Sequence, residues 1–294
     1  MDLGGQGVLS QIVIALAVAT TIFILYFIAE QIYLWWNGFK KLRVVLQDKT
    51  LTLPSDNDKF LEQNPANPLL QDKILTLSEN QLTGIEFSYT LFVYISPTTD
   101  NGKDEVGWKT IFYKGYGSGP YPLCGPGVFV SSSNSENGNP TLRVVMNTYE
   151  RWYNTVDVNQ VPFRKWFHLA LVLRRNTMEV YVNGNLANRA SFKGTLPYQN
   201  YQGLYIAPNK VTSLPIDFDN SSGNSFKRGI PPGDNFVIRG GINGYISRMT
   251  YFSYALTYSE LQNAMNVGPN PEMDQDNMDK PPYLIDSWWT QMKG

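Results

Sequence analysis

Residues 163–192 read FRKWFHLALVLRRNTMEVYVNGNLANRASF, and this stretch decides the fold of the chain. Two runs in it, Trp166 to Leu173 and Thr177 to Val182, are rich in the β-branched and aromatic residues that strands favour. The second run leads into Asn183-Gly184, a dipeptide suited to the positive φ angles of a tight hairpin turn. The stretch therefore predicts strands joined by short turns.

The same pattern extends in both directions along the chain. From Ile85 to Ile95, apolar residues alternate with other residues, which predicts a strand with one face in a core. Gly, Pro and Asn are frequent in the connections, and helical periodicity is nearly absent beyond the N-terminal region, so we expect an all-β, antiparallel β-sandwich. Two stretches, 55–68 and 269–282, are polar and contain proline, and we expect them to be loop and tail. The other predicted strands are 42–46, 141–146, 203–206, 236–238 and 244–252.

The central stretch resembles the core signature of laminin-G-like, concanavalin A-like jelly-roll domains. It carries the Trp, His and Ala of one strand at Trp166, His168 and Ala170, followed by the Tyr-Val-Asn-Gly ending of the next strand. Other family landmarks follow in order: GIEFSYTLFVYI at 84–95, WKTIFYKG at 108–115 and GGINGYISRMTYFSYALTYSEL at 240–261. The resemblance covers residues 80–268 and implies a jelly-roll sandwich. The family includes lectins, glycanases and domains that bind nothing, so the resemblance specifies the fold better than the function.

Residues Val8 to Ala29 carry no charge and are almost all apolar. As a helix they would be about 33 Å long, enough for a hydrocarbon core of about 30 Å. We therefore expect one transmembrane α-helix rather than a buried core helix. A cleaved signal peptide is disfavoured, because no Lys or Arg precedes the apolar run. The residues expected at the membrane interface are Tyr33, Trp35, Trp36, Lys40, Lys41 and Arg43.

The charges around this span predict its orientation. Lys and Arg follow it and do not precede it, which places the N-terminus outside or in the lumen and the rest of the chain in the cytosol, or facing a viral capsid. Cys124 is the single cysteine, as expected in a reducing compartment. In this topology the sequon at Asn220 would not be glycosylated. The predicted organisation is a tail (1–7), the span and its aromatic flank (8–36), a juxtamembrane segment with an edge strand (37–79), the sandwich (80–268) and an acidic, proline-rich tail with an aromatic end (269–294).

Composition narrows the partners. The formal net charge is −1, and no basic cluster is interleaved with aromatics, which excludes a broad attraction to nucleic acid. The expected partners are the lipid bilayer, a protein at the membrane and, as an alternative, a glycan. An N-terminal anchor joined to one such domain also resembles membrane proteins of large double-stranded DNA viruses, which implies a virion protein.

Catalytic residues are not expected. Glycanases of this fold place carboxylates two residues apart on one strand, and the nearest such string, Glu272 to Asp276, lies in the acidic tail. Glu86 and Glu179 are isolated on their strands. His168 is expected to be a hydrogen-bonded residue of the sandwich, and Cys124 a small buried hydrophobic residue.

Binding residues are sought in the loops. Aromatic rings that could stack on a sugar are Tyr116, Tyr121, Trp152, Tyr153, Tyr198 and Tyr201. Asp217, Asp219 and Asn220 have oxygen ligands at a spacing that could start a Ca²⁺ site, although a solvated loop explains them as well, and otherwise we expect no cofactor. The main hypothesis is a non-catalytic structural or protein-interaction module at a membrane. The alternative is a membrane-bound lectin, and the remote alternative is a glycoside hydrolase.

Overall fold

The computed structural model describes residues 5–54, 59–64, 74–76, 78, 85–97, 107–117, 119–131, 139–192, 197–209, 211–213 and 236–274. The chain divides into two compact units, Met1–Arg43 and Val44–Gly294. The first unit holds the helix α1 (Gly5–Leu42). Within α1, the segment Gln11–Tyr33 is long and apolar enough to cross a membrane by length and composition, and its side chains are exposed all round. Tyr33 and Arg43 are exposed, whereas the side chains of Trp35, Trp36, Lys40 and Lys41 lie outside the described part.

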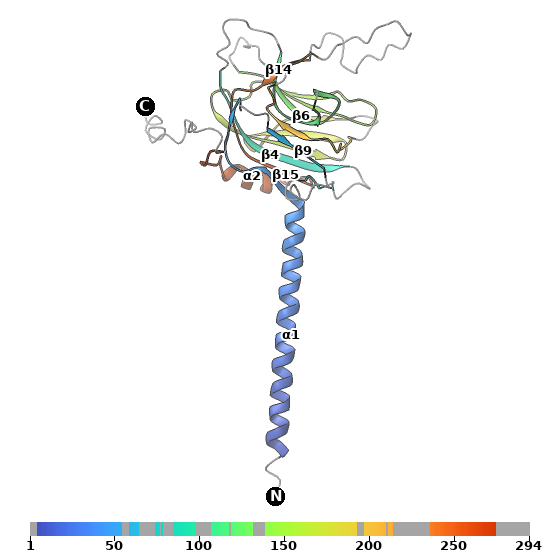
Figure 1. The fold of residues 1–294 in the computed structure, drawn as a ribbon, viewed down its shortest axis with the longest axis vertical. Coiled ribbons are helices and arrows are strands. Elements are labelled where there is room, and N and C mark those ends of the chain that lie inside the picture. The colour runs from blue at the N-terminus through green and yellow to red at the C-terminus, as the bar shows by residue number, and fades with distance from the viewer. Residues whose placement is uncertain are drawn as a thin grey trace, which may run out of the picture. The chain divides into compact units, whose positions relative to one another are not determined.

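The second unit is a β-sandwich of two sheets (Figure 1). The seven-stranded sheet runs β1 (Arg43–Gln47), β15 (Gly244–Phe252), β4 (Glu86–Ile95), β9 (Trp166–Arg174), β10 (Thr177–Val182) and β11 (Asn185–Ser191), and β2 (Leu51–Leu53) also pairs with β15. The eight-stranded sheet runs β13 (Val211–Ser213), β14 (Val237–Gly241), β5 (Trp108–Tyr116), β6 (Gly119–Ser131), β7 (Leu142–Met146) and β8 (Asn154–Val158). In that sheet β12 (Leu204–Ile206) pairs with β5 and with β3 (Lys59–Leu61).

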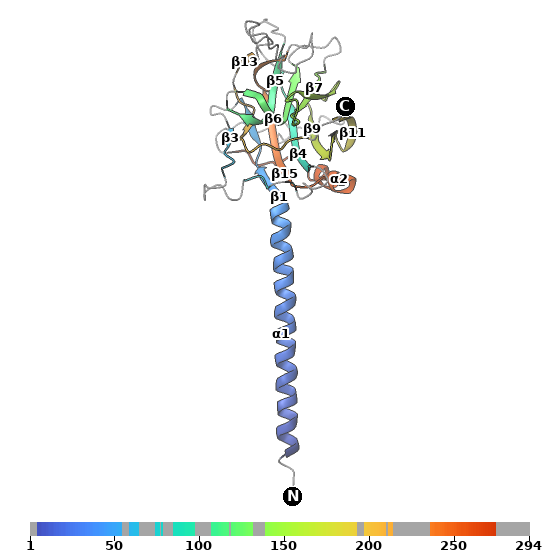
Figure 2. The ribbon, with the colours of Figure 1, turned by 90° about the vertical axis from the view of Figure 1, so that its right-hand side faces the viewer.

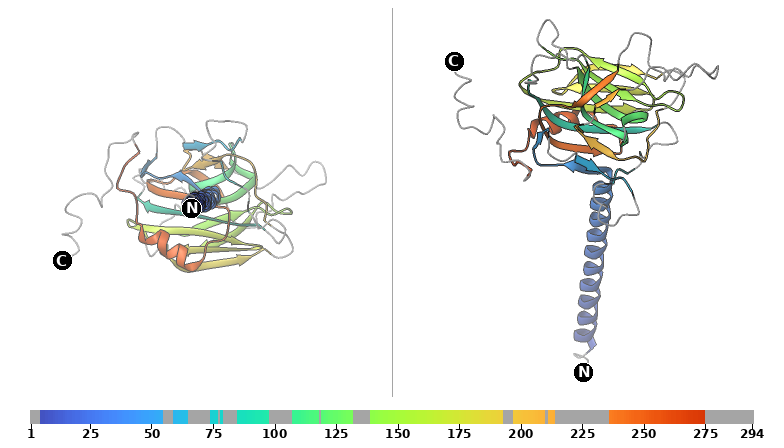
Figure 3. Two further views of the ribbon diagram at one scale, coloured as in Figure 1. Left: turned by 90° about the horizontal axis from the view of Figure 1, so that it is seen from below. Right: turned by 45° about the horizontal axis from the view of Figure 1, so that its top comes forward.

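The main core lies between the two sheets, whose layers are seen in Figure 3. Alternate residues of β4, including Tyr89 and Leu91, face alternate residues of the other sheet, including Phe112, in this core. The expected alternation of 85–95 is confirmed for this inner face. The other face of this strand is covered as well, since Ser88 and Thr90 on it are also buried.

The outer face of the seven-stranded sheet is covered in part by a helix that the sequence analysis did not predict. The helix α2 (Tyr258–Asn266) follows β15, and it packs Leu261 against Ala170 and Val172 of β9. Its start is a capping box, in which Thr257 and Glu260 each accept a backbone N–H of the other. Figures 2 and 3 show α2 beside β10 and β11 at this face of the sheet.

The predicted hairpin turn at Asn183-Gly184 is confirmed. Both residues have positive φ, 49° and 73°, and β10 pairs with β11 across the turn. The Asn183 side chain also accepts the backbone N–H of His168 at 2.9 Å, while the Asn183 N–H donates to the His168 carbonyl at 2.8 Å. The turn is therefore fastened to β9 as well as closing β10 and β11.

Several short elements differ from the sequence predictions. The strand predicted at 42–46 exists as the edge strand β1, but the expected loop 55–68 contains β3. Cys124 lies inside β6, and β6, β8 and β13 were not predicted. One pair of the described strands, β14 with β5, is parallel, whereas the sequence analysis expected an antiparallel sandwich.

The first residues of the predicted acidic tail are part of the folded unit. Met273 forms a parallel bridge with Thr50, whose N–H donates to the Glu272 carbonyl at 2.8 Å. The Asp274 carboxylate pairs with Lys59 at 3.0 Å, and the Glu272 carboxylate lies 3.3 Å from the Lys49 ammonium. Two of the carboxylates of the Glu272–Asp276 string thus hold the chain end against the strands that follow β1.

Candidate functional site

The loop between β7 and β8 builds a polar site. Its turn is closed by Thr148, whose N–H donates to the Arg151 carbonyl at 2.7 Å and whose hydroxyl accepts the Arg151 N–H at 3.2 Å. The Asn154 side-chain amide donates to the carbonyls of Met146 and Arg151. These bonds hold Tyr149 at the tip of the turn, where it is 69% exposed.

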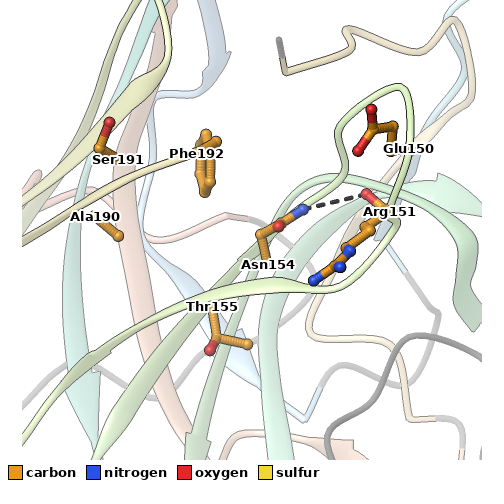
Figure 4. A pocket seen from close by; sticks show the side chains of 7 residues that line it. All are labelled: Glu150, Arg151, Asn154, Thr155, Ala190, Ser191 and Phe192. Atoms are coloured by element: carbon orange, nitrogen blue, oxygen red, sulfur yellow. Dashed lines mark hydrogen bonds between the residues drawn. The ribbon is translucent and has the colours of Figure 1, made fainter. Parts of the chain in front are cut away.

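A cavity of about 360 Å³ opens beside this loop. One wall comes from the loop and β8, and the other comes from the end of β11. Figure 4 shows the Arg151 side chain turned toward Asn154 and Thr155, with the end of β11 on the far side. The lining residues are Glu150, Arg151, Asn154, Thr155, Ala190, Ser191 and Phe192. We call them the polar pocket.

The polar pocket combines a carboxylate, a guanidinium, an amide and two hydroxyls over the buried ring of Phe192. Such a set can both donate and accept hydrogen bonds, which suits a ligand rich in hydroxyls. Tyr149 directly precedes the lining residue Glu150, and its ring packs edge-on against Tyr198, with ring centroids 5.2 Å apart.

A second segment, residues 197–203, is fastened beside the loop. Asn147 joins the two, since its carbonyl accepts the Tyr198 N–H and its side-chain amide donates to the Tyr198 carbonyl, each at 3.1 Å. The Lys114 ammonium donates to the carbonyls of Asn200 and Gln202, each at 2.6 Å. Lys114 is 2% exposed, and burial lowers its pKa to about 7. Lys114 also lines a smaller cavity of about 190 Å³ with Tyr201.

The structure separates the aromatic residues that the sequence singled out. Tyr198 packs against Tyr149, Tyr201 is 65% exposed on the same segment as Tyr198, and Tyr116 is 38% exposed at the end of β5. Trp152 and Tyr153 are 8% and 5% exposed, because their rings pack against Phe236 from a distant part of the chain. Neither ring has an open face for a sugar, so we do not propose Trp152 or Tyr153 as sugar-binding residues. The side chain of Tyr121 lies outside the described part.

Sequence reasoning missed Tyr149, Glu150, Arg151 and Asn154 as site residues. Tyr149 lies in the same YERWYNT stretch as Trp152 and Tyr153, and nothing local distinguishes the exposed ring from the buried ones. The Thr148 turn and the neighbouring β11 wall bring the polar residues together. The end of β11 lies more than thirty positions after this loop in the sequence. The spacing of residues along the chain therefore does not predict that the two form one pocket.

Cys124 and His168, the single cysteine and the single histidine of the sequence, are both buried. Cys124 is fully buried, as expected, and burial raises the pKa of its thiol. His168 is 1% exposed, but neither ring nitrogen has a hydrogen-bond partner in the described part of the chain, so the expected hydrogen-bonded histidine is wrong. Its ring packs beside Phe92 at 5.0 Å, and burial lowers its pKa to about 4.

The Ca²⁺ candidates Asp217, Asp219 and Asn220 all lie outside the described residues. Within the described ranges, no group of three or more His, Cys, Asp or Glu side chains is gathered to hold a metal ion. The prediction of no cofactor, with Ca²⁺ as its alternative, stays a prediction.

Comparison with solved structures finds chains of low similarity. The receptor-binding domain of botulinum neurotoxin D is 13% identical, with a TM-score of 0.43, over 78% of this chain and 53% of that one. Domain 4 of an extracellular arabinanase from Geobacillus stearothermophilus, in complex with arabinotriose, is 15% identical with a TM-score of 0.34, over 62% of this chain and 68% of that one. A sialidase from Trypanosoma rangeli is 14% identical with a TM-score of 0.38, over 67% of this chain and 24% of the sialidase. The chain spans about half the length of the neurotoxin receptor-binding domain that it matches.

A comparison with curated proteins found no match. A laminin G family model does match, over residues 71–262, which is more than half of the chain. The matched residues overlap most of residues 80–268, the stretch whose motifs resemble the family. The match also agrees with the two-sheet sandwich of the structure. The chain belongs to the concanavalin A-like lectin/glucanases superfamily, as a laminin-G-like jelly-roll domain that follows one apolar N-terminal helix.

Proposed function

We propose that this chain is a single-pass membrane protein whose sandwich is a non-catalytic binding domain, and that its ligand is a carbohydrate. The observation that carries the ligand class is the polar pocket. Its hydrogen-bonding groups, neutral and charged, come in part from the loop that carries the exposed Tyr149, whose ring packs against the half-buried Tyr198. Sugars need both features, because hydroxyls require polar partners and pyranose faces favour aromatic rings.

Membrane anchoring rests on α1. Its apolar segment is exposed on every side and has the length of a bilayer core. Lys and Arg lie on its C-terminal side, which supports a cytosolic sandwich under the positive-inside rule.

The non-catalytic assignment is supported by the way the acidic side chains are used. Asp157 accepts two bonds from Arg143, at 2.8 and 2.6 Å, and Glu179 pairs with Arg174 at 3.3 Å. These two carboxylates are thus bound to arginine side chains of the sandwich, whereas a glycanase directs its two carboxyl groups at the bond that it cleaves.

A protein partner at the membrane is the second candidate. It is favoured by the exposure of Tyr149 and Tyr201, since exposed tyrosines are common at protein interfaces. A role at a virion stays a prediction from the sequence resemblance.

Binding of the full chain in lipid nanodiscs to an array of oligosaccharides tests the ligand class. We expect binding to a subset of glycans, and its loss in the double variant Arg151→Ala, Asn154→Ala. Arg189→Ala is the matched control, because it removes an exposed guanidinium on β11 that does not line the pocket. Absence of glycan binding, or binding that survives the double variant, would contradict the proposed site.

A further inference from the structure

The polar pocket lies between edge strands of the two sheets. β8 is the last strand of the eight-stranded sheet, and β11 is the last strand of the seven-stranded sheet. Asn154 and Thr155 belong to the start of β8, whereas Ala190 and Ser191 belong to the end of β11, and all four line the pocket (Figure 4). The shape of the pocket therefore depends on how the two edges approach each other.

One hydrogen bond joins the two edges beside the pocket. The side-chain amide of Asn188 on β11 donates to the backbone carbonyl of Asp157 on β8 at 2.6 Å. Thr155 lies two residues before this point on β8, and Ala190 lies two residues after it on β11. Two residues of a strand span about 7 Å. We call the bond between Asn188 and Asp157 the edge bridge, and it joins the two walls at one end of the pocket.

Both partners of the edge bridge are held by further contacts. The Asp157 carboxylate accepts two hydrogen bonds from the Arg143 guanidinium of β7, at 2.8 and 2.6 Å. That guanidinium also lies 4.3 Å from the centroid of the Trp108 ring. On β11, the Asn188 side-chain oxygen accepts the backbone N–H of Arg189 at 2.8 Å, which leaves the amide nitrogen for the bridge. The bridge is thus part of the ordered sandwich.

The other boundaries of the polar pocket differ in their exposure. Phe192 is 5% exposed and belongs to the core between the sheets, so the pocket does not continue into the sandwich at this residue. Glu150 and Arg151, which line the pocket from the loop before β8, are both exposed. Among the described residues, the pocket is therefore closed at the edge bridge and at the core, and it opens to solvent at the loop.

We propose that the polar pocket binds the terminal residue of a glycan rather than a residue in the interior of the chain. The inference rests on the proposed carbohydrate ligand. An interior residue is linked to neighbours on both sides, so one of them would lie against the edge bridge. A terminal residue needs a single exit, and the remainder of the glycan can extend past the exposed loop. The volume of about 360 Å³ is at the low end of the roughly 300–1,000 Å³ of small-molecule sites, which suits one end of a glycan.

The hydrogen-bonding groups of the pocket support the same preference. A terminal residue keeps a hydroxyl that an interior residue uses in its linkage. The Asn154 amide nitrogen donates to two carbonyls of the loop, whereas its side-chain oxygen accepts no hydrogen bond from the described part of the chain. This oxygen can accept a sugar hydroxyl, and the Thr155 hydroxyl can donate to one or accept from one. An added residue at that hydroxyl removes its proton and needs space that the edge bridge occupies.

The test uses the full chain in nanodiscs and an array of oligosaccharides attached through their reducing ends. The array is composed so that each monosaccharide is terminal in some members and interior in others. We expect binding to follow the terminal residue. Adding one further residue to the free end of a bound glycan should lower its affinity at least about tenfold, because a hydrogen bond is lost and the added residue meets the bridge.

Asn188→Ala removes the edge bridge and should reduce this difference between terminal and extended glycans. Asn188 is exposed, so the variant should keep the fold, and an unchanged melting temperature checks this. Asn185→Ala is the matched control, since Asn185 is also exposed on β11 and its amide donates to the Asn183 carbonyl within the turn. This control should leave the difference unchanged.

The outcomes separate the inference from the proposed function. Equal binding of a monosaccharide in terminal and interior positions would overturn the inference and leave the carbohydrate ligand in place. A folded Asn188→Ala variant with the same preference as the unmodified chain would also overturn it, because the edge bridge would then not close the pocket. Absence of binding to every member of the array would overturn the proposed carbohydrate ligand, and the inference with it.

Discussion

His168 couples the stability of the sandwich to pH. Burial without a partner for its ring lowers its pKa to about 4, against about 6.5 in an unfolded chain. Between these values the unfolded chain binds a proton that the folded chain does not, so stability falls as the pH falls from about 6.5 to about 4. The full difference is about 3 kcal/mol, at 1.36 kcal/mol per pKa unit.

His168→Phe should remove most of this dependence, because Phe fills the space beside Phe92 and carries no proton. Thermal unfolding of the full chain in mild detergent, followed by near-ultraviolet circular dichroism at pH 7.5 and 4.5, measures it. We expect the melting temperature of the unmodified chain to drop more between these pH values than that of the variant. Equal drops would mean that His168 stays neutral in both states or gains a partner when protonated.

At the scale of elements, the hairpin turn has the sharpest requirement. Gly184 has a φ of 73°, and a Cβ there would lie 2.5 Å from the Gln262 side chain of α2. Gly184→Val should therefore destabilise the domain by about 1–3 kcal/mol through backbone strain, and by more if Gln262 cannot move. Gly268→Ala is the control, since Gly268 has a φ of 70° but open space around it. An unchanged melting temperature for Gly184→Val would show that the turn tolerates a β-branched residue.

The cap of α2 gives a second prediction at this scale. Thr257 accepts the Glu260 N–H, and the Glu260 carboxylate accepts the Thr257 N–H at 2.8 Å. Thr257→Ala should cost about 1 kcal/mol, and Thr257→Ser should cost little, because Ser keeps the capping oxygen. Chemical denaturation of both variants checks this. Equal stability of the Ala and Ser variants would mean that the cap contributes nothing.

The sequence predicts long elements better than short ones, because the pattern of a long element is local, whereas a short strand depends on its pairing with a distant one. The alternation in 85–95 and the Asn183-Gly184 pair identify β4 and the hairpin, because these signals are local. β3 has three residues, and its existence depends on β12, more than 140 positions away. The helix α2 was missed although Thr257 and Glu260 have capping-box spacing, a local signal that the resemblance to a closing strand region obscured. The polar pocket needs β8 and β11 side by side, which is tertiary information.

At the scale of the whole molecule, the two units should separate. Val44–Gly294 is a compact unit with its own core, and the apolar helix precedes it. Deleting residues 1–39 should therefore yield a soluble, folded domain that keeps β1 intact. Far-ultraviolet circular dichroism should show a β-rich spectrum, and the protein should leave membranes on carbonate extraction, unlike the full chain. A helix-dominated spectrum or continued membrane retention would contradict this division.

The last prediction is that the domain hydrolyses no β-glucan, xylan, agarose or chitin oligomer. Hydrolysis on this scaffold needs two carboxyl groups about 5–5.5 Å apart for retention, or about 6.5–9.5 Å for inversion. Glu179 is held by Arg174 and by the Tyr181 hydroxyl at 2.9 Å, and Glu86 lies on β4 opposite Arg174. Neither Glu86 nor Glu179 has an acidic residue two or four positions further along its strand, so neither has a second carboxyl at that spacing. Reducing-end assays on purified protein should show no turnover, and turnover abolished by Glu86→Gln or Glu179→Gln would make the domain an enzyme.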